Sequence, residues 1–145
     1  MVVLLDVNVL VALFDPSHVN HESAHEWFGG EGRRSWATCP ITENGCVRVL
    51  SNPSYPSAQT TVQDVIERLT RFCKDSGHVF WQDDVSLLTA LEPALLSRLQ
   101  GPQQLTDFYL AALARHHTGR LSTFDGSLVR ALAGTGLEPV LHLLR

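Results

Sequence analysis

Short apolar, β-branched runs alternate along this chain with longer segments of helical periodicity, and this alternation limits the possible folds most strongly. The expected strands lie at residues 2–5, 35–38, 79–81, 121–124 and 139–141. The expected helices lie at 9–14, 18–30, 41–50, 61–74, 85–99, 103–117 and 127–133, with Pro93 as the place where the fifth would break. Strands that alternate with helices pair in parallel through crossovers. The sequence therefore predicts an α/β fold, a three-layer α/β/α sandwich with a mostly parallel central sheet of about five strands.

The composition fits one globular domain that spans residues 1–145. Hydrophobic residues make up 44% of the chain and charged residues 18%, and no repeat, low-complexity segment or linker interrupts it. No apolar run reaches the length of a membrane span, and no basic residue precedes the first apolar run as in a signal peptide. We therefore expect a cytoplasmic protein without a membrane partner. Its three cysteines lack C-x-x-C spacing, so we expect reduced, buried thiols at Cys39, Cys46 and Cys73.

The net charge of −4 argues neither for nor against a nucleic-acid partner. Ten of the eleven basic residues are arginine, the residue type best suited to bidentate phosphate contacts. A pocket of carboxylates would also be largely neutralised by the divalent ions that it binds.

Two of the expected strands end in an aspartate: Asp6 follows the first strand, and Asp125 follows the fourth. In open parallel sheets, ligands bind beyond the carboxyl ends of the strands. Each aspartate could instead cap the next helix, and Asp125 with Gly126 is also a good turn pair. Taken singly, each therefore favours a structural role.

Two further acids, Glu43 and Asp107, lie on the apolar sides of their helices. Steps of three, four and seven residues reach only apolar side chains: Cys46, Val47 and Leu50 from Glu43, and Leu110, Ala111 and Ala114 from Asp107. An inward carboxylate needs a partner, a cap or a metal. The alternative is a helix-dipole role in the first turn. Together with the two strand-end aspartates, these acids indicate that all four converge on one cleft.

Four clustered carboxylates would repel one another unless a cation compensated their charge. Oxygen ligands select hard ions, so the expected cofactor is Mg²⁺, for which Mn²⁺ could substitute. Such a site suits the hydrolysis of phosphodiester bonds. The sequence therefore predicts that the same four residues bind the metal and form the catalytic site: Asp6, Glu43, Asp107 and Asp125.

Four short segments together resemble the acidic motifs of PIN-domain proteins and are most similar to those of VapC-type toxins. The segments are Leu5–Leu10, Ile41–Gly45, Leu105–Asp107 and Ser122–Asp125. The resemblance implies a homodimeric, Mg²⁺-dependent endoribonuclease that cuts structured cellular RNA and is silenced by a cognate VapB-type antitoxin. It also implies that Asp6, Glu43 and Asp107 are the main metal ligands and that Asp125 is more substitutable. Asn8 and Thr123 would support the ligands by hydrogen bonds.

The segment His21–His25 also matches H-E-x-x-H, a pattern typical of zinc hydrolases. In that alternative, His21 and His25 would bind Zn²⁺ and Glu22 would be the general base. The extended pattern requires glycine at position 28 and histidine at position 31, where this chain has Phe28 and Glu31. His18, His21 and His25 could otherwise line the approach of RNA.

A phosphate-accepting receiver or phosphatase-like domain would also place acids at strand ends. The phosphatase pattern requires an acid two residues after the first one, where this chain has Asn8. The receiver pattern requires a lysine late in the chain, and the only lysine is Lys74. Both alternatives are therefore disfavoured.

An antitoxin that blocks a carboxylate cleft is expected to carry arginine, which pairs bidentately with carboxylates. Apolar helix faces would form the rest of its groove. The sequence offers the Val62–Phe72 helix and the Trp27–Phe28 pair for this role, although either could belong to the core. No pattern in the sequence distinguishes transfer, ribosomal or messenger RNA as the substrate.

Overall fold

A five-stranded parallel sheet forms the centre of the molecule in a computed structural model that describes residues 1–57 and 60–145. All four neighbouring pairs of strands are parallel, in the order β3-β2-β1-β4-β5. The strands are β1 (Val3–Leu5), β2 (Trp36–Thr38), β3 (His78–Phe80), β4 (Arg120–Thr123) and β5 (Leu141–Leu143). The α/β fold predicted from the alternation of strands and helices is thereby confirmed.

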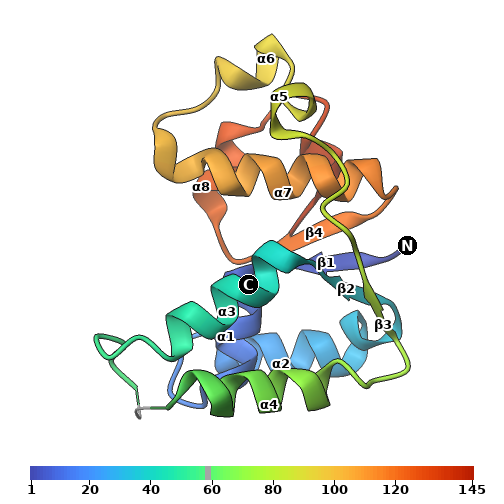
Figure 1. The fold of residues 1–145 in the computed structure, drawn as a ribbon. Helices are drawn as coiled ribbons and strands as arrows, with labels where there is room; N and C mark the ends of the chain where they lie inside the picture. The colour runs from blue at the N-terminus through green and yellow to red at the C-terminus, as the bar shows by residue number, and fades with distance from the viewer. Residues whose placement is uncertain (58–59) are drawn as a thin grey trace.

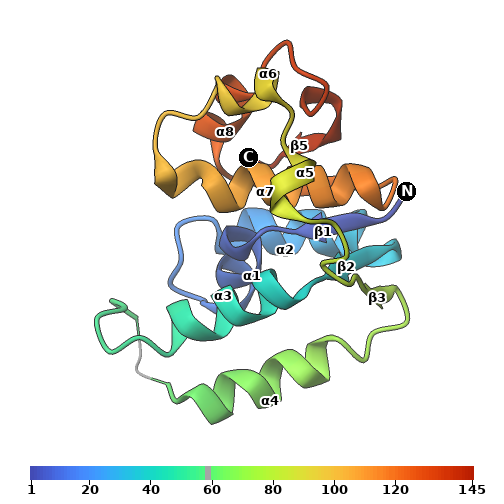
Figure 2. The same ribbon diagram turned by 45° about the horizontal axis from the view of Figure 1, so that its top comes forward.

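Helices cover both faces of this sheet (Figures 1 and 2). One face carries α1 (Val7–Phe14), α2 (His21–Gly30), α3 (Pro40–Leu50) and α4 (Val62–Phe72). The other carries α5 (Leu87–Ala90), α6 (Pro93–Leu96), α7 (Leu105–His116) and α8 (Gly126–Ala131). Within the described residues, no helix has the length and apolar character needed to cross a membrane.

Successive residues of the central strand β1 feed the two apolar cores on opposite faces of the sheet. Leu4 packs in the core that includes α7, whereas Leu5 packs in the core that includes α1 and α2. Both side chains are fully buried. This arrangement follows from the two-residue period of a strand, which points neighbouring side chains to opposite faces. Because both faces of this strand are covered, none of its positions favours a polar side chain, which explains the unbroken apolar run in the sequence.

Besides shifts of one or two residues at the ends of other elements, three of the predicted elements differ in their bounds. The segment expected to form one helix at 85–99 forms two short helices, because Glu92 adopts an extended backbone before Pro93. The last strand begins at Leu141 and not at Pro139, since proline has no N–H for the ladder and lies here in a 3-10 turn. Helix α2 begins at His21, three residues later than expected.

The strand order brings distant parts of the chain to one edge of the sheet. Leu5 of β1 is in register with Ser122 of β4, so the residues that follow them also lie side by side. On the other side of β1, strand β2 ends at Thr38 and leads directly into α3. The carboxyl ends of these three strands therefore meet where the sequence places its acids.

Candidate functional site

Asp6 lies between β1 and α1, and it is 4% exposed. Its Oδ1 accepts a hydrogen bond from the Val7 N–H at 2.8 Å and so caps α1. Its Oδ2 accepts from the Thr123 hydroxyl at 2.8 Å and from the Asn8 amide at 3.4 Å. Burial raises the pKa of Asp6, although the bonds from Thr123 and Val7 act in the opposite direction. An ionised carboxylate at this place therefore favours a nearby cation.

Asn8 and Thr123 connect the end of β4 to the start of α1. The Asn8 amide nitrogen donates to Thr123 Oγ1 at 3.0 Å, and Asn8 Oδ1 accepts from the Phe124 N–H at 3.1 Å. Thr123 Oγ1 also accepts from the Asp125 N–H at 3.1 Å. These bonds fix the orientation of the Asp6 carboxylate, which is the type of support given to metal ligands in proteins.

Asp107 and Asp125 share the electrostatic environment of Asp6. Asp107 is half-buried in the first turn of α7, where burial and the negative charges of Asp6 and Asp125 raise its pKa to about 7. Asp125 caps α8, because its Oδ1 accepts from the N–H groups of Ser127 at 2.9 Å and Leu128 at 3.3 Å. Asp125 therefore has the capping role that its sequence position suggests, and its charge also raises the pKa of Asp107.

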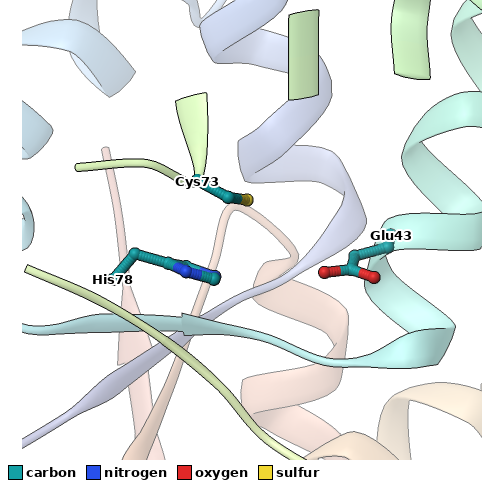
Figure 3. Close-up of side chains that lie close together, drawn as sticks. All are labelled: Glu43, Cys73 and His78. Atoms are coloured by element: carbon teal, nitrogen blue, oxygen red, sulfur yellow. The ribbon is translucent and has the colours of Figure 1, made fainter. Parts of the chain in front are cut away.

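Glu43 lies in the first turn of α3, and its carboxylate faces a different set of side chains. Its Oε2 accepts a hydrogen bond from Thr38 Oγ1 at 2.8 Å. Figure 3 shows the carboxylate pointing toward Cys73 and His78, and one ligand atom from each of these three residues lies within 4.8 Å of the others. Glu43 therefore points to another cluster, whereas the charges of Asp6 and Asp125 raise the pKa of Asp107.

The three aspartates fit a hard cation such as Mg²⁺. Their donors are all carboxylate oxygens, and the pKa values of Asp6 and Asp107 are raised first by burial and then by neighbouring negative charges, which a bound cation would compensate. Among the described residues, no three of the predicted acids hold their oxygens within 4.8 Å of one another. Mg²⁺ keeps several water ligands and takes one or two carboxylates directly.

The surroundings of Glu43 include two residues that belong to none of the sequence motifs, Thr38 and His78. Cys73, expected to be a buried thiol, is half-buried beside them, whereas Cys39 and Cys46 are buried as predicted; all three thiols are free. In the sequence, the only feature that points to this cluster is the short distance between Cys73 and His78, which have four residues between them. This distance predicts a contact with Glu43 only when β3 is known to lie next to β2.

The two histidines of the H-E-x-x-H segment contact the backbone of α1. His21 Nδ1 lies 2.8 Å from the Ala12 carbonyl oxygen, and His25 Nε2 lies 2.9 Å from that of Leu13. Both carbonyls belong to the last turn of α1, where they have no partner within the helix. In the described part of the chain, no third ligand atom joins these rings to form a metal cluster. The arrangement gives the zinc-hydrolase alternative no support.

A groove of about 1170 Å³ runs between α3 and α4. Apolar side chains of both helices line it, among them Val47, Val62, Ile66 and Leu69, and Glu43 and Cys73 also border it. Val62 and Ile66 are 54% and 48% exposed. The apolar face of α4 therefore flanks a groove, as predicted for the Val62–Phe72 helix.

The prediction that the Trp27–Phe28 pair also flanks the groove is wrong, because Phe28 belongs to the core. Its ring centroid lies 5.3 Å from that of Trp36 and 5.1 Å from that of Phe72, and its side chain is buried. Trp27 packs edge-on against His142, away from the residues that line the groove.

Comparisons with known proteins agree with this fold. The chain matches the family model described as PIN domain over residues 3–132. It is 50% identical over 125 residues to Ribonuclease VapC44 of Mycobacterium tuberculosis, which covers 86% of this chain and 87% of that protein. It is 43% identical over 141 residues to Ribonuclease VapC39 of the same organism, which covers 97% of this chain and 100% of that protein.

A solved structure is similar to this chain over most of its length. The crystal structure of Mycobacterium tuberculosis VapC20, described as a Sarcin-Ricin loop cleaving toxin, matches with a TM-score of 0.67 and 13% identity. The match covers 89% of this chain and 94% of that one. At this level of identity, the likeness shows a shared fold.

Proposed function

We propose the active site of this chain from its membership in the PIN-domain family, in which it is a VapC-type ribonuclease toxin of a toxin–antitoxin system. Four acids form the proposed active site: Asp6, Glu43, Asp107 and Asp125. The proposed reaction is the endonucleolytic hydrolysis of phosphodiester bonds in cellular RNA, with Mg²⁺ as the cofactor and Mn²⁺ as a substitute. The observation that carries this assignment is the position of Asp6 and Asp125 after the carboxyl ends of the neighbouring strands β1 and β4, and the charges of both raise the pKa of Asp107.

When bound, Mg²⁺ supplies Lewis-acid polarisation of the phosphoryl oxygen and a lowered pKa for a bound water. The residues of the chain supply the position of the donors. Thr123 and Asn8 hold Asp6 by hydrogen bonds, and the start of α8 holds Asp125. Asp107, with a pKa of about 7, can give up its proton near neutral pH as a cation binds.

Glu43 is included because its helix starts at the same edge of the sheet. Helix α3 follows directly after β2, the neighbour of β1. In this proposal Glu43 is the most mobile of the four donors, because its longer side chain has an additional rotatable bond. Its hydrogen bond with Thr38 would be exchanged for a metal contact when the cation binds.

The proposed partners are an RNA substrate, a VapB-type antitoxin and a second copy of the chain. The relatives are named ribonucleases, and the proposed substrate, cellular RNA, supports a cytoplasmic location. The cleavage site ascribed to VapC20 is not carried over, because the similarity at 13% identity concerns the fold. Exposed apolar side chains on the edge strand β3, Val79 and Phe80, support a homodimer.

The test is cleavage of structured RNA by the purified protein, followed by sequencing of the new RNA ends. Asp6→Asn and Asp107→Asn should each lower the rate by orders of magnitude while the fold is retained, since both remove charge from a repulsive cluster. Asp125→Asn should have a milder effect, because asparagine also caps helices and its amide oxygen can still orient a water. Glu26→Gln, an exposed acid on α2, is the matched control.

If Asp6→Asn were as active as wild type, the assignment of the active site would be wrong. Undiminished cleavage in EDTA would also contradict it, since that result separates the reaction from any divalent ion. Glu43→Gln is informative in its own right, because a large loss of activity would place Glu43 with the three aspartates during the reaction.

A further inference from the structure

Three side chains of different chemistry lie close together (Figure 3). Glu43 comes from the first turn of α3, Cys73 caps the C-terminal end of α4, and His78 begins β3. One carboxylate oxygen, the sulfur and one ring nitrogen all lie within 4.8 Å of one another. Each of the three residues is half-buried, so the cluster is reachable from solvent and still shielded from it.

The Thr38 hydroxyl lies at the centre of this cluster. Its oxygen is 2.8 Å from Glu43 Oε2 and 2.8 Å from His78 Nε2, and it also contacts the Cys73 thiol. A hydroxyl has a single proton and can donate to only one of these groups at a time. Its oxygen can also accept from the His78 ring N–H or the Cys73 S–H, so all three side chains direct a polar atom toward the same small volume.

We propose that Glu43, Cys73 and His78 form a Zn²⁺ site, which shares Glu43 with the proposed Mg²⁺ site but otherwise uses different residues. Sulfur, nitrogen and carboxylate oxygen are the donors that Zn²⁺ takes in proteins, whereas Mg²⁺ takes oxygen. Three protein ligands leave the fourth tetrahedral position to water.

The backbone and the groove both favour such a site. Only residues 74–77 separate Cys73 from His78, so one short connection presents two of the ligands together. Glu43 and Cys73 also line the groove between α3 and α4, which gives an ion a path to the cluster.

The protonation states of the cluster are compatible with this role. Burial raises the pKa of the Cys73 thiol to about 11, and burial lowers the pKa of His78. At neutral pH the imidazole is therefore uncharged and offers a lone pair, and the thiol gives up its proton when Zn²⁺ binds.

A second group of potential ligands lies at the C-terminal end of α7. His117 and His116 approach Asp84 with nitrogen–oxygen distances of 3.1 and 3.4 Å. This group is more exposed and contains no thiol. The sulfur of Cys73 therefore gives the proposed site a spectroscopic signature that the second group lacks.

The shared residue Glu43 links the proposed site to the reaction. Zn²⁺ bound by Cys73 and His78 would hold Glu43 away from the aspartates and so inhibit RNA cleavage. This consequence rests on the proposed function, whereas the binding of Zn²⁺ does not.

The test is a titration of the metal-free, full-length protein with Co²⁺, a spectroscopic substitute for Zn²⁺, without RNA. We expect one equivalent to produce a thiolate-to-cobalt charge-transfer band that Zn²⁺ then removes. Cys73→Ser should abolish the band, and His78→Gln should weaken Co²⁺ binding about tenfold or more. Cys39→Ala, which removes a buried thiol outside the cluster, should leave it unchanged.

Three results would overturn the site: no thiolate band in the folded wild-type protein, an unchanged band in Cys73→Ser, or unchanged Co²⁺ affinity in His78→Gln. Asp107→Asn separates the two proposals, because it should keep the band and lose Mg²⁺-dependent cleavage. In the activity assay, one equivalent of Zn²⁺ should inhibit wild type, and Cys73→Ser should resist this inhibition.

Discussion

The Thr123 hydroxyl donates a hydrogen bond to Asp6 Oδ2 at 2.8 Å, although 117 positions separate the two residues along the chain. The parallel register of β1 and β4 creates this contact, because Leu5 pairs with Ser122 and the next residue of each strand follows in step. The bond lowers the pKa of Asp6, which burial raises. It therefore helps to keep the carboxylate ionised and correctly oriented for a cation.

Thr123→Val should lower RNA cleavage about 10- to 100-fold, the usual cost of removing a hydrogen-bond partner from a metal ligand. The acidic limb of the pH profile should move to higher pH, because Asp6 loses a bond that favours its charged form. Thr123→Ser keeps the hydroxyl and should retain most of the activity. The measurement is kcat/KM as a function of pH for all three proteins. Equal profiles for the valine and serine variants would show that the hydroxyl does not act through Asp6.

The raised pKa of Asp107 predicts how the stability of the metal-free protein depends on pH. Its pKa of about 7 in the folded state lies above the ordinary value of 3.8, so the folded protein binds more protons than the unfolded one between these values. Stability should therefore fall as pH rises through this window. Asp107→Asn stays neutral and should reduce that fall by on the order of 1 kcal/mol after solvent screening is considered.

Urea unfolding of both proteins in EDTA at pH 4.5 and pH 7.5 tests this prediction (the two pH values lie roughly at the ends of the window). Asp6 contributes a dependence of the same sign in both proteins, so the difference between them isolates Asp107. An identical pH dependence would mean that Asp107 titrates as an ordinary exposed carboxyl group.

The strand-end aspartates show how much of the site the sequence could predict. Asp6 and Asp125 follow apolar runs, and two parallel strands that end in acids bring them to one edge of a sheet whenever the strands are neighbours. Helical periodicity placed Asp107 on the inward side of α7 in the same way. These inferences depend on local patterns and on one rule of topology, which is why they could be made from one sequence.

Glu43 and His78 show where such inference ends. Periodicity gives the side of a helix on which Glu43 lies, but the direction of its carboxylate depends on Thr38, which donates a hydrogen bond to it. His78 reaches the cluster only because β3 pairs with β2, and the order of strands is a property of the whole fold. Phe28 is a similar case, since its burial depends on Trp36 and Phe72, which lie in other elements.

The all-oxygen donor set at Asp6, Asp107 and Asp125 predicts the metal dependence. Mg²⁺ or Mn²⁺ should restore RNA cleavage to EDTA-treated protein, and Zn²⁺ should not substitute efficiently. The measurement is cleavage of one structured RNA with each ion added back alone. Restoration by Zn²⁺ alone, together with hydrolysis of peptide bonds, would instead support catalysis by His21 and His25.

The double variant His21→Ala/His25→Ala should keep its ribonuclease activity and lose stability. The two rings contact the Ala12 and Leu13 carbonyls, and each net hydrogen bond is worth about 1 kcal/mol. Thermal unfolding should therefore begin at a lower temperature, while RNA cleavage below that temperature stays close to that of wild type. A folded double variant without activity would give these histidines a role in RNA binding or catalysis.

The groove between α3 and α4 predicts how the antitoxin binds. Its apolar wall carries Val62 and Ile66, and Glu43 lies on its border, so a helix with an apolar face and an arginine matches both features. Ile66→Asp should therefore abolish co-purification with the product of the neighbouring gene while RNA cleavage is retained. Val19→Asp, at an exposed apolar residue outside the groove, is the control and should still bind the partner.

Expression in cells and light scattering extend this test to the toxin role. Expressed alone, the wild-type protein should arrest growth, and Asp6→Asn should relieve the arrest without loss of partner binding, because Asp6 lies outside the groove lining. Size-exclusion chromatography with light scattering should give a dimer for the protein alone and a larger complex with the partner. A strict monomer would contradict the proposed homodimer. Full partner binding by Ile66→Asp would place the antitoxin on another surface, since a buried carboxylate in an apolar groove is costly.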